Sequence, residues 1–122
     1  MSLRMQDVIC FMGINLHRKL TLDVLAGAAY LSTSRLRHSF KAEVGLTPTQ
    51  YLQRLRMERA KELLETTRLS VKEIRSRVGF SGDSHFVNDF RRAFGVSPAR
   101  YRARRVSLLP EVPPARVSHF VQ

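Results

Sequence analysis

The residue types that most often carry out chemistry are few and scattered in this sequence. One cysteine, Cys10, and four histidines, His17, His38, His85 and His119, have neither the spacing of a metal-ligand set nor that of a nucleophile with its base. Cys10 lies in an apolar stretch, so we expect a buried and inert thiol, with a reactive thiol as the alternative. We therefore expect no catalytic residue, no metal site and no cofactor.

The charge of the chain favours an acidic binding partner. Its 122 residues carry a formal charge of +11, and 17 of the 21 basic residues are arginine, whose planar fork suits phosphates and guanine edges. The 43% hydrophobic content is too high for a disordered basic tail. No apolar run is long enough to span a membrane, and a signal peptide is not expected. The single cysteine excludes an internal disulfide and a cysteine-based zinc finger. Nucleic acid is the favoured partner.

An internal duplication supplies the framework. Residues 40–51 run parallel to residues 90–101 at an offset of 50, whereas the segments upstream of them match at an offset of 49. The second copy therefore has one extra residue, near Ser81. Each copy contains two stretches of helical periodicity separated by a short turn. Two copies are too few for a solenoid but are enough for two similar subdomains.

Capping residues set the expected ends of these helices. The first helix of each copy follows a serine or threonine, and Glu73 completes a capping box in the second copy. The second helix of each copy ends at a glycine suited to a left-handed conformation. The expected cap residues are Thr21, Ser32, Gly45, Thr47, Ser70, Gly82, Gly95 and Ser97.

The duplication predicts an all-α fold of two helix-turn-helix subdomains, each a homeodomain-like three-helix unit, joined by a long connector helix. We expect an N-terminal helix and lead-in over 1–19, in which a helix over 6–16 buries Val8, Ile9 and Ile14. The first helix-turn-helix covers 20–47, the connector helix 48–66, the second helix-turn-helix 67–105 and a flexible tail 106–122. The 19-residue connector would span roughly 28 Å, close to the roughly 34 Å between successive major grooves on one side of B-DNA.

The second helix of a helix-turn-helix enters the major groove. In the first copy Leu36 and Phe40 mark the core side of this helix. The groove-facing candidates lie opposite or beside that stripe, and arginine among them suits guanine. They are Thr33, Ser34, Arg37, His38 and Lys41, of which Lys41 lies deepest along the helix and suits phosphate.

The second copy offers a different set of hydrogen-bonding groups. Asparagine suits adenine, valine suits a thymine methyl group, and an aspartate accepts a hydrogen bond from a cytosine amine. The candidates are Asp83, Ser84, Val87, Asn88 and Arg91. Helix 32–44 has three basic residues and one acidic residue, whereas helix 82–94 has two of each. Because phosphate repels acidic groups, we expect the first helix to supply more of the affinity.

Residues from about 20 to 102 resemble the DNA-binding domain of the AraC/XylS family of bacterial transcription regulators. The residues that match the family's pattern most strongly lie in the second copy, in the order Ile74, Val78, Gly79, Phe80, Phe86, 90–92, 94–98, Tyr101 and Arg102. Those of the first copy and connector are Leu25, Ala26, Ser32, Leu36, Phe40, Gly45, Pro48, Tyr51, Arg56, Ala60, Leu63 and Leu64.

The resemblance implies two recognition helices in adjacent major grooves and control of transcription initiation, usually activation through RNA polymerase. By position, it places base contacts on Ser34, Arg37, His38, Asp83, Ser84, Val87 and Asn88. It also implies a cytoplasmic, nucleoid-associated protein with no membrane partner. The family usually has a small residue where this chain has Arg75. Either the Arg75 side chain extends into solvent, or the second subdomain packs more loosely.

Three alternatives remain at this point: a weakly specific architectural DNA-binding protein, the DNA-binding part of a larger sensor-regulator, and an RNA-binding protein. The neutral second helix partly fits the architectural alternative. An RNA-binding protein needs exposed aromatic residues for stacking, whereas Tyr30, Tyr51 and Tyr101 occupy expected core or cap positions. No site for a small-molecule effector is visible in this sequence.

We predict that Arg37→Ala weakens binding to the best DNA site by about 1–3 kcal/mol and relaxes the preference at one base position. Asn88→Ala should cost less if the first helix supplies more of the affinity. Titration of each variant against a matched set of single-base variants of the duplex measures both effects. Unchanged base preference would exclude Arg37 as a base reader, and equal losses would contradict the unequal contribution of the helices.

Overall fold

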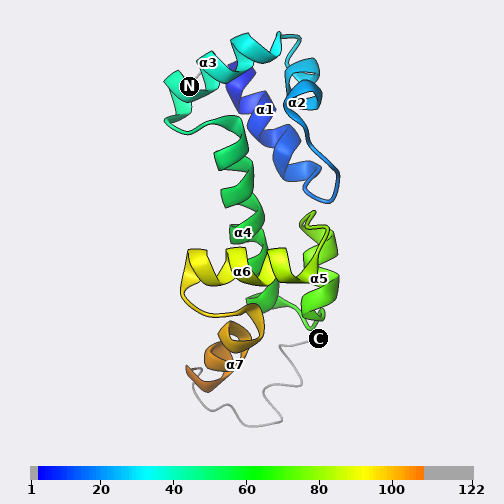
Figure 1. The fold of residues 1–122 in the computed structure, drawn as a ribbon, viewed down its shortest axis with the longest axis vertical. Helices are drawn as coiled ribbons and strands as arrows, with labels where there is room; N and C mark the ends of the chain where they lie inside the picture. The colour runs from blue at the N-terminus through cyan, green and yellow to red at the C-terminus, as the bar shows by residue number, and fades with distance from the viewer. Residues whose placement is uncertain (1–2, 109–122) are drawn as a thin grey trace.

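The computed structural model describes residues 3–108, with side chains over 4–104, and this part of the chain contains helices and no strands. The helix α4 runs along the long axis of the molecule, with α1–α3 at one end and α5–α7 at the other (Figure 1). The predicted all-α fold with two helix-turn-helix units is confirmed. The helices are α1 (Leu3–Ile14), α2 (Leu22–Ala28), α3 (Thr33–Val44), α4 (Pro48–Thr66), α5 (Val71–Arg77), α6 (Asp83–Phe94) and α7 (Pro98–Leu108).

Five helices begin at hydroxyl side chains that cap them. Each hydroxyl oxygen accepts a hydrogen bond from the backbone N–H three residues later, which satisfies a donor that the helix itself leaves unpaired. Gln50 and Glu73 complete capping boxes, and the hydrogen bond from the backbone N–H of Ser70 lowers the pKa of the Glu73 carboxyl. The five caps, all predicted from the sequence, are Thr21, Ser32, Thr47, Ser70 and Ser97.

Glycines end both recognition helices, as predicted. Gly45 and Gly95 follow α3 and α6 with φ of 91° and 86°, and their N–H groups donate to the carbonyls of Lys41 and Arg91. At the other end of α6, Gly82 provides no side-chain hydrogen bond to the helix. The second recognition helix therefore begins with one stabilising contact fewer than the first.

Each end of the molecule has its own hydrophobic core. One core is built by α1–α3 with the first half of α4, and the other by α5–α7 with its second half. Phe40 and Tyr51 meet edge to face with ring centres 5.6 Å apart, and their counterparts Phe90 and Tyr101 meet at 5.7 Å. The duplicated sequence therefore builds duplicated packing.

Two expectations about α1 were wrong. The helix buries Met5, Val8 and Met12 on one stripe, whereas Ile14 is 76% exposed and Cys10 is also exposed. At about 100° per residue, Ile14 and Cys10 lie on the opposite side of the helix from that stripe. An apolar segment alone did not reveal which of its side chains face the core.

The two helix-turn-helix turns differ at one equivalent position. Tyr30 and Gly79, 49 residues apart, both have a positive φ, of 57° and 89°. Tyr30 is 93% exposed and so does not belong to the core, but its N–H donates to the carbonyl of Gly27, which places it in the C-terminal cap of α2. Its side chain projects from a left-handed turn, away from the packed faces of α2 and α3, and the left-handed backbone carries strain for a residue other than glycine.

The last described helix, α7, ends at Leu108 and so includes the first three residues of the predicted tail, 106–108. The rest of the predicted tail, 109–122, lies outside the described residues. Tyr101 and Arg102 attach α7 to the end of α4, where Tyr101 donates to Glu65 and Arg102 donates to the carbonyls of Leu64, Thr67 and Leu69. None of the described helices is long and apolar enough to cross a membrane.

We predict that Gly79→Ala destabilises the protein more than Gly95→Ala does. Both residues have a positive φ, which costs alanine about 1–2 kcal/mol. A Cβ at Gly79 would also lie 2.1 Å from the carbonyl oxygen of Leu16, whereas nothing lies within 4 Å of a Cβ at Gly95. Relieving that overlap should cost a further ~1–3 kcal/mol. Urea unfolding of the two variants tests the difference, and equal losses would contradict it.

Candidate nucleic-acid interface

The predicted recognition residues of the first copy form an open polar face on α3. Leu36 and Phe40 are completely buried, which fixes the opposite side of the helix toward solvent. The predicted residues Ser34, Arg37, His38 and Lys41 are exposed, and Thr33 at the start of the helix is partly buried. Their exposure leaves them accessible to base edges or phosphates, and their contacts with DNA remain a prediction.

Lys41 has an additional contact within its own helix. Its Nζ donates to the carbonyl oxygen of Gly45 at 3.1 Å, at the negative end of the α3 dipole. This contact lies at the end of α3 farthest from Thr33. A contact between Lys41 and phosphate, as the sequence predicts, would require the ammonium to share or leave this carbonyl.

The predicted residues of the second copy are arranged similarly on α6. Phe86 and Phe90 are completely buried. Ser84, Asn88 and Arg91 are exposed, and Val87 is partly buried. Asp83, the first residue of α6, is also exposed but pairs with a residue of α5.

That residue is Arg75, for which neither expectation from the sequence was correct. Its side chain is 14% exposed, its Nη1 donates to the carbonyl of Phe80 at 2.7 Å, and its Nε lies 2.6 Å from Oδ1 of Asp83. The guanidinium lies against the turn between α5 and α6 instead of extending into solvent. It ties the two helices together, so the presence of arginine is no sign of loose packing.

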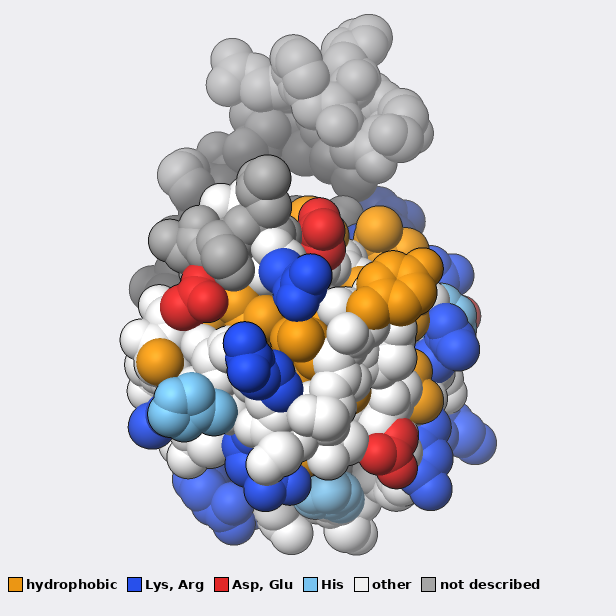
Figure 2. Space-filling view, turned by 90° about the horizontal axis from the view of Figure 1, so that it is seen from above, with side chains coloured by type: hydrophobic (Ala, Val, Ile, Leu, Met, Phe, Trp, Pro, Cys, Tyr) orange, Lys and Arg blue, Asp and Glu red, His pale blue; other side chains and the backbone are white. Residues whose placement is uncertain are grey.

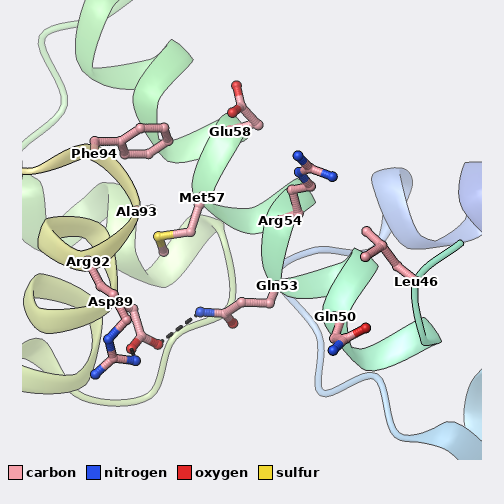
Figure 3. Close-up of a pocket in the computed structure, with 10 residues that line it drawn as sticks. All are labelled: Leu46, Gln50, Gln53, Arg54, Met57, Glu58, Asp89, Arg92, Ala93 and Phe94. Atoms are coloured by element: carbon pink, nitrogen blue, oxygen red, sulfur yellow. Dashed lines mark hydrogen bonds and ion pairs between the residues drawn. The ribbon is translucent and has the colours of Figure 1, made fainter.

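The second acidic residue of α6 faces the connector helix. The Asp89 side chain is 11% exposed, and its Oδ2 accepts a hydrogen bond of 2.9 Å from the side-chain amide of Gln53 on α4 (Figure 3). His85 and Arg92 on the same helix lie 2.9 and 3.4 Å from the carboxylate. Counting charges along the sequence therefore overstated the acidity of the groove-facing side, because both carboxylates of α6 are engaged by neighbours.

Gln53 and Asp89 also border an open hollow between α4 and the end of α6 (Figure 3). The hollow measures about 600 Å³ and combines the apolar Leu46, Met57 and Phe94 with polar and charged side chains. Among the described residues no group of three histidine, cysteine or acidic side chains is placed to hold a metal ion.

Arg56 joins the two helix-turn-helix units across the connector. Its Nη2 donates to the carbonyl oxygens of Arg18 at 2.9 Å and Leu16 at 3.4 Å, in the loop between α1 and α2. Gly79 of the second turn packs against the same guanidinium and the same Leu16 carbonyl. Burial lowers the pKa of Arg56, but an arginine remains charged. We call this contact the Arg56 clamp.

Basic side chains are spread over the end of the molecule formed by α1–α3. Viewed from that end, lysine and arginine predominate over acidic residues, and histidine side chains lie among them (Figure 2). This distribution suits a phosphate backbone, since contacts with several phosphates supply affinity without sequence information.

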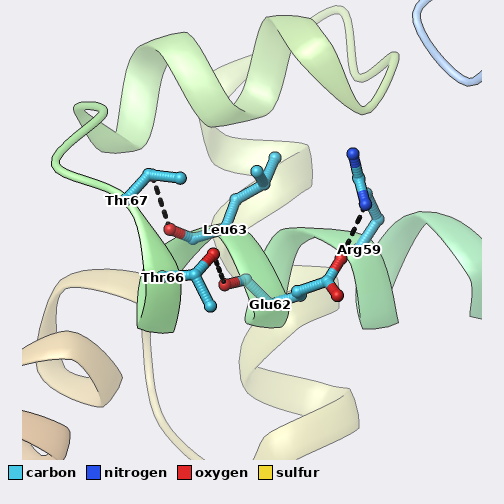
Figure 4. Close-up of polar contacts among 5 residues, drawn as sticks. All are labelled: Arg59, Glu62, Leu63, Thr66 and Thr67. Carbon is cyan, nitrogen blue, oxygen red and sulfur yellow. Dashed lines mark hydrogen bonds and ion pairs between the residues drawn. The ribbon is translucent and has the colours of Figure 1, made fainter.

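Side-chain hydrogen bonds form at the C-terminal end of the connector helix. The hydroxyls of Thr66 and Thr67 donate to the carbonyls of Glu62 and Leu63 at 2.8 and 2.6 Å (Figure 4). The Arg59–Glu62 pair, at 2.7 Å, lies on its exposed side (Figure 4). The Leu63 carbonyl also accepts from the backbone N–H of Thr67, whereas the carbonyls of Leu64 and Thr67, which the end of the helix leaves unpaired, accept from Arg102.

Sequence reasoning missed Arg56, Gln53 and Arg75 as residues that orient the recognition helices. Arg56 and Gln53 have partners 36 to 40 residues away, which no local pattern indicates. The sequence did mark Arg75 as unusual, because an arginine stands there where the first copy has Ala26, at the offset of 49.

Comparisons of sequence relate the chain to helix-turn-helix regulators. A family described as a helix-turn-helix domain matches residues 25–104. The transcriptional activator RhaS of Escherichia coli (strain K12 / DH10B) is 41% identical over 87 residues, which cover 71% of this chain and 31% of RhaS. The probable transcriptional regulator LumQ of Photobacterium leiognathi is 35% identical over 88 residues, which cover 72% of this chain and 36% of LumQ. The chain thus spans about a third of the length of these curated relatives.

Solved structures match nearly the whole described chain. The DNA-binding domain of AdpA, solved in complex with a target DNA, has a TM-score of 0.84 at 33% identity and covers 91% of this chain and 100% of that chain. A transcriptional regulator from Chromobacterium violaceum with an AraC-type DNA-binding domain has a TM-score of 0.78 at 30% identity and covers 87% of this chain and 95% of that chain. The similarity therefore includes both helix-turn-helix units.

We predict that Arg56→Met relaxes the spacing that the two units require between their DNA sites. The change removes the hydrogen bonds to Leu16 and Arg18, which should also lower the free energy of unfolding by about 1.5–3 kcal/mol. Binding is measured on duplexes whose two sites are separated by one or two base pairs more or fewer than the best spacing. The variant should discriminate less among them than the unchanged protein does.

Arg59→Met is the matched control, because it removes the same charge from an exposed pair on α4 worth about 0–1 kcal/mol. An Arg56→Met protein with undiminished spacing preference would show that α4 alone sets the distance between the recognition helices.

Proposed function

The chain belongs to the AraC/XylS family of helix-turn-helix transcription regulators, and we propose that it reads a two-part DNA site with α3 and α6 in successive major grooves. The proposed base-reading residues are Thr33, Ser34, Arg37 and His38 on α3 and Asp83, Ser84, Val87 and Asn88 on α6. Lys41 and Arg91 are proposed to contact phosphate. The two reading units correspond to the subdomains proposed over 20–47 and 67–105.

The observation that carries this proposal is the paired arrangement of the recognition helices. Each helix buries two large side chains and exposes a polar face, and one continuous helix of 19 residues joins the two units. At about 1.5 Å per residue α4 extends roughly 28 Å, close to one turn of B-DNA. The Arg56 clamp limits rotation of one unit against the other, so the two helices can bind one duplex without first being ordered.

We propose further that binding regulates transcription at bacterial promoters, most simply as activation through contact with RNA polymerase. The protein would then act by binding alone, in the cytoplasm and in association with the nucleoid. The relatives RhaS and LumQ are described as a transcriptional activator and a probable transcriptional regulator. The chain spans about a third of the length of these relatives. The DNA-binding part of a larger sensor-regulator would have the same activity, and this is the alternative proposal.

Selection of binding sites from a random duplex pool at about physiological salt tests the proposal. We predict two enriched sequence blocks whose centres lie about one helical turn apart, because both recognition helices read bases. A single block would mean that one unit reads the sequence and the other only anchors the protein. Tight, salt-sensitive binding without any enriched sequence would instead support a weakly specific architectural protein.

A further inference from the structure

The two helix-turn-helix units share a backbone but differ in one pair of side chains. In the first turn the N–H of Leu31 donates to the carbonyl of Ala26 at 2.9 Å, and in the second turn the N–H of Phe80 donates to Arg75 at 3.0 Å. Arg75 and Ala26 are thus equivalent positions. Asp83, the first residue of α6, is equivalent to Thr33, the first residue of α3. An alanine and a threonine in one copy correspond to an ion pair in the other.

Two neighbours hold the guanidinium of Arg75, one by a hydrogen bond and the other as a close ion pair without an aligned hydrogen bond. Nη1 donates to the carbonyl of Phe80, and Nε lies 2.6 Å from Oδ1 of Asp83. Because the Arg75 side chain is 14% exposed, its guanidinium is held at the base of the turn and is not available as an extended arm to the duplex. The planar fork of arginine suits such a two-point contact, which a lysine cannot reproduce.

Asp83, in contrast, remains accessible from the groove side. Its side chain is 70% exposed although one oxygen faces Arg75. A carboxylate has about four acceptor positions, so the exposed oxygen remains able to accept another hydrogen bond. Asp83 also lies at the positive end of the α6 dipole, where a negative charge is stabilising.

Resting on the proposed function, we propose that Arg75 is a positioning residue for sequence reading by α6: it holds the Asp83 carboxylate in place to accept a hydrogen bond from the N4 amine of a cytosine. An unpaired carboxylate at the tip of a recognition helix would be repelled by the phosphates. The pairing with Arg75 offsets this repulsion and fixes the direction of the free oxygen. Cytosine is the base that presents an amine donor without an adjacent acceptor in the major groove.

Binding-site selection with the unchanged protein, Arg75→Met and Asp83→Asn tests the proposal. In the unchanged protein one position of the block read by α6 should be cytosine. Arg75→Met should reduce the preference for cytosine at that position by roughly tenfold or more, as should Asp83→Asn, while the other enriched positions are retained. Combining the two changes should add little, because both remove the same contact.

Two further variants separate positioning from stability. Arg77→Met removes an exposed charge from the same helix without touching Asp83 and should leave the cytosine preference unchanged. The double change Arg75→Ala with Asp83→Thr introduces the residue pair of the first copy and leaves no unpaired buried charge. This variant should lose the preference for cytosine while its free energy of unfolding stays close to that of the unchanged protein. It keeps the test valid if Arg75→Met folds poorly.

Retained cytosine preference in a folded Arg75 variant, or a uniform loss of affinity at every position, would overturn the positioning role. An unchanged protein that enriches two blocks without cytosine at the α6 tip would also overturn it while leaving the proposed function intact. If the unchanged protein enriches no sequence at all, the proposed function itself fails, and the inference fails with it.

Discussion

The contact between the Arg56 guanidinium and the carbonyls of Leu16 and Arg18 is the constraint on which the arrangement of the molecule depends. Each unit has its own core, so hydrophobic packing alone stabilises two bodies without fixing the angle between them. The connector helix joins them, and the clamp, with Gly79 packed against it, contacts residues on both sides of the connector. In the proposed two-part binding the recognition helices enter one duplex in a matching orientation, so we expect the affinity to depend on a hydrogen-bonded contact remote from the recognition residues.

Local physics explains which features could be predicted from the sequence. Caps at Ser32, Thr47 and Ser70 act within three residues, so their pattern is visible in the sequence and their helices were predicted correctly. The recognition faces also followed from helical periodicity. The exposure of Ile14 and Tyr30 depends on which neighbours cover each side of a helix or turn. The partners of Arg56 could not be predicted either, because backbone carbonyls in a distant loop leave no mark on residue type.

The two recognition helices, although related by duplication, are supported differently. The α3 helix has a serine cap and, among its five predicted recognition residues, one contact to its own C-terminal carbonyl. The α6 helix lacks a side-chain cap, but its carboxylates are tied to neighbouring helices, Asp83 to α5 and Asp89 to α4. The orientation of α6 therefore depends on contacts beyond its own residues, whereas α3 is oriented mainly by its packing and its caps.

The equivalent turn positions Tyr30 and Gly79 give the duplicated chain a fixed order. The first turn faces solvent and accommodates a tyrosine at a positive φ, whereas the second is closed by a carbonyl 2.1 Å from where a Cβ would be. A chimaera that exchanged the two units would place the tyrosine where only glycine fits. The repeats are thus not interchangeable modules, and recombination between related regulators would preserve the fold only if it kept a glycine in the downstream turn.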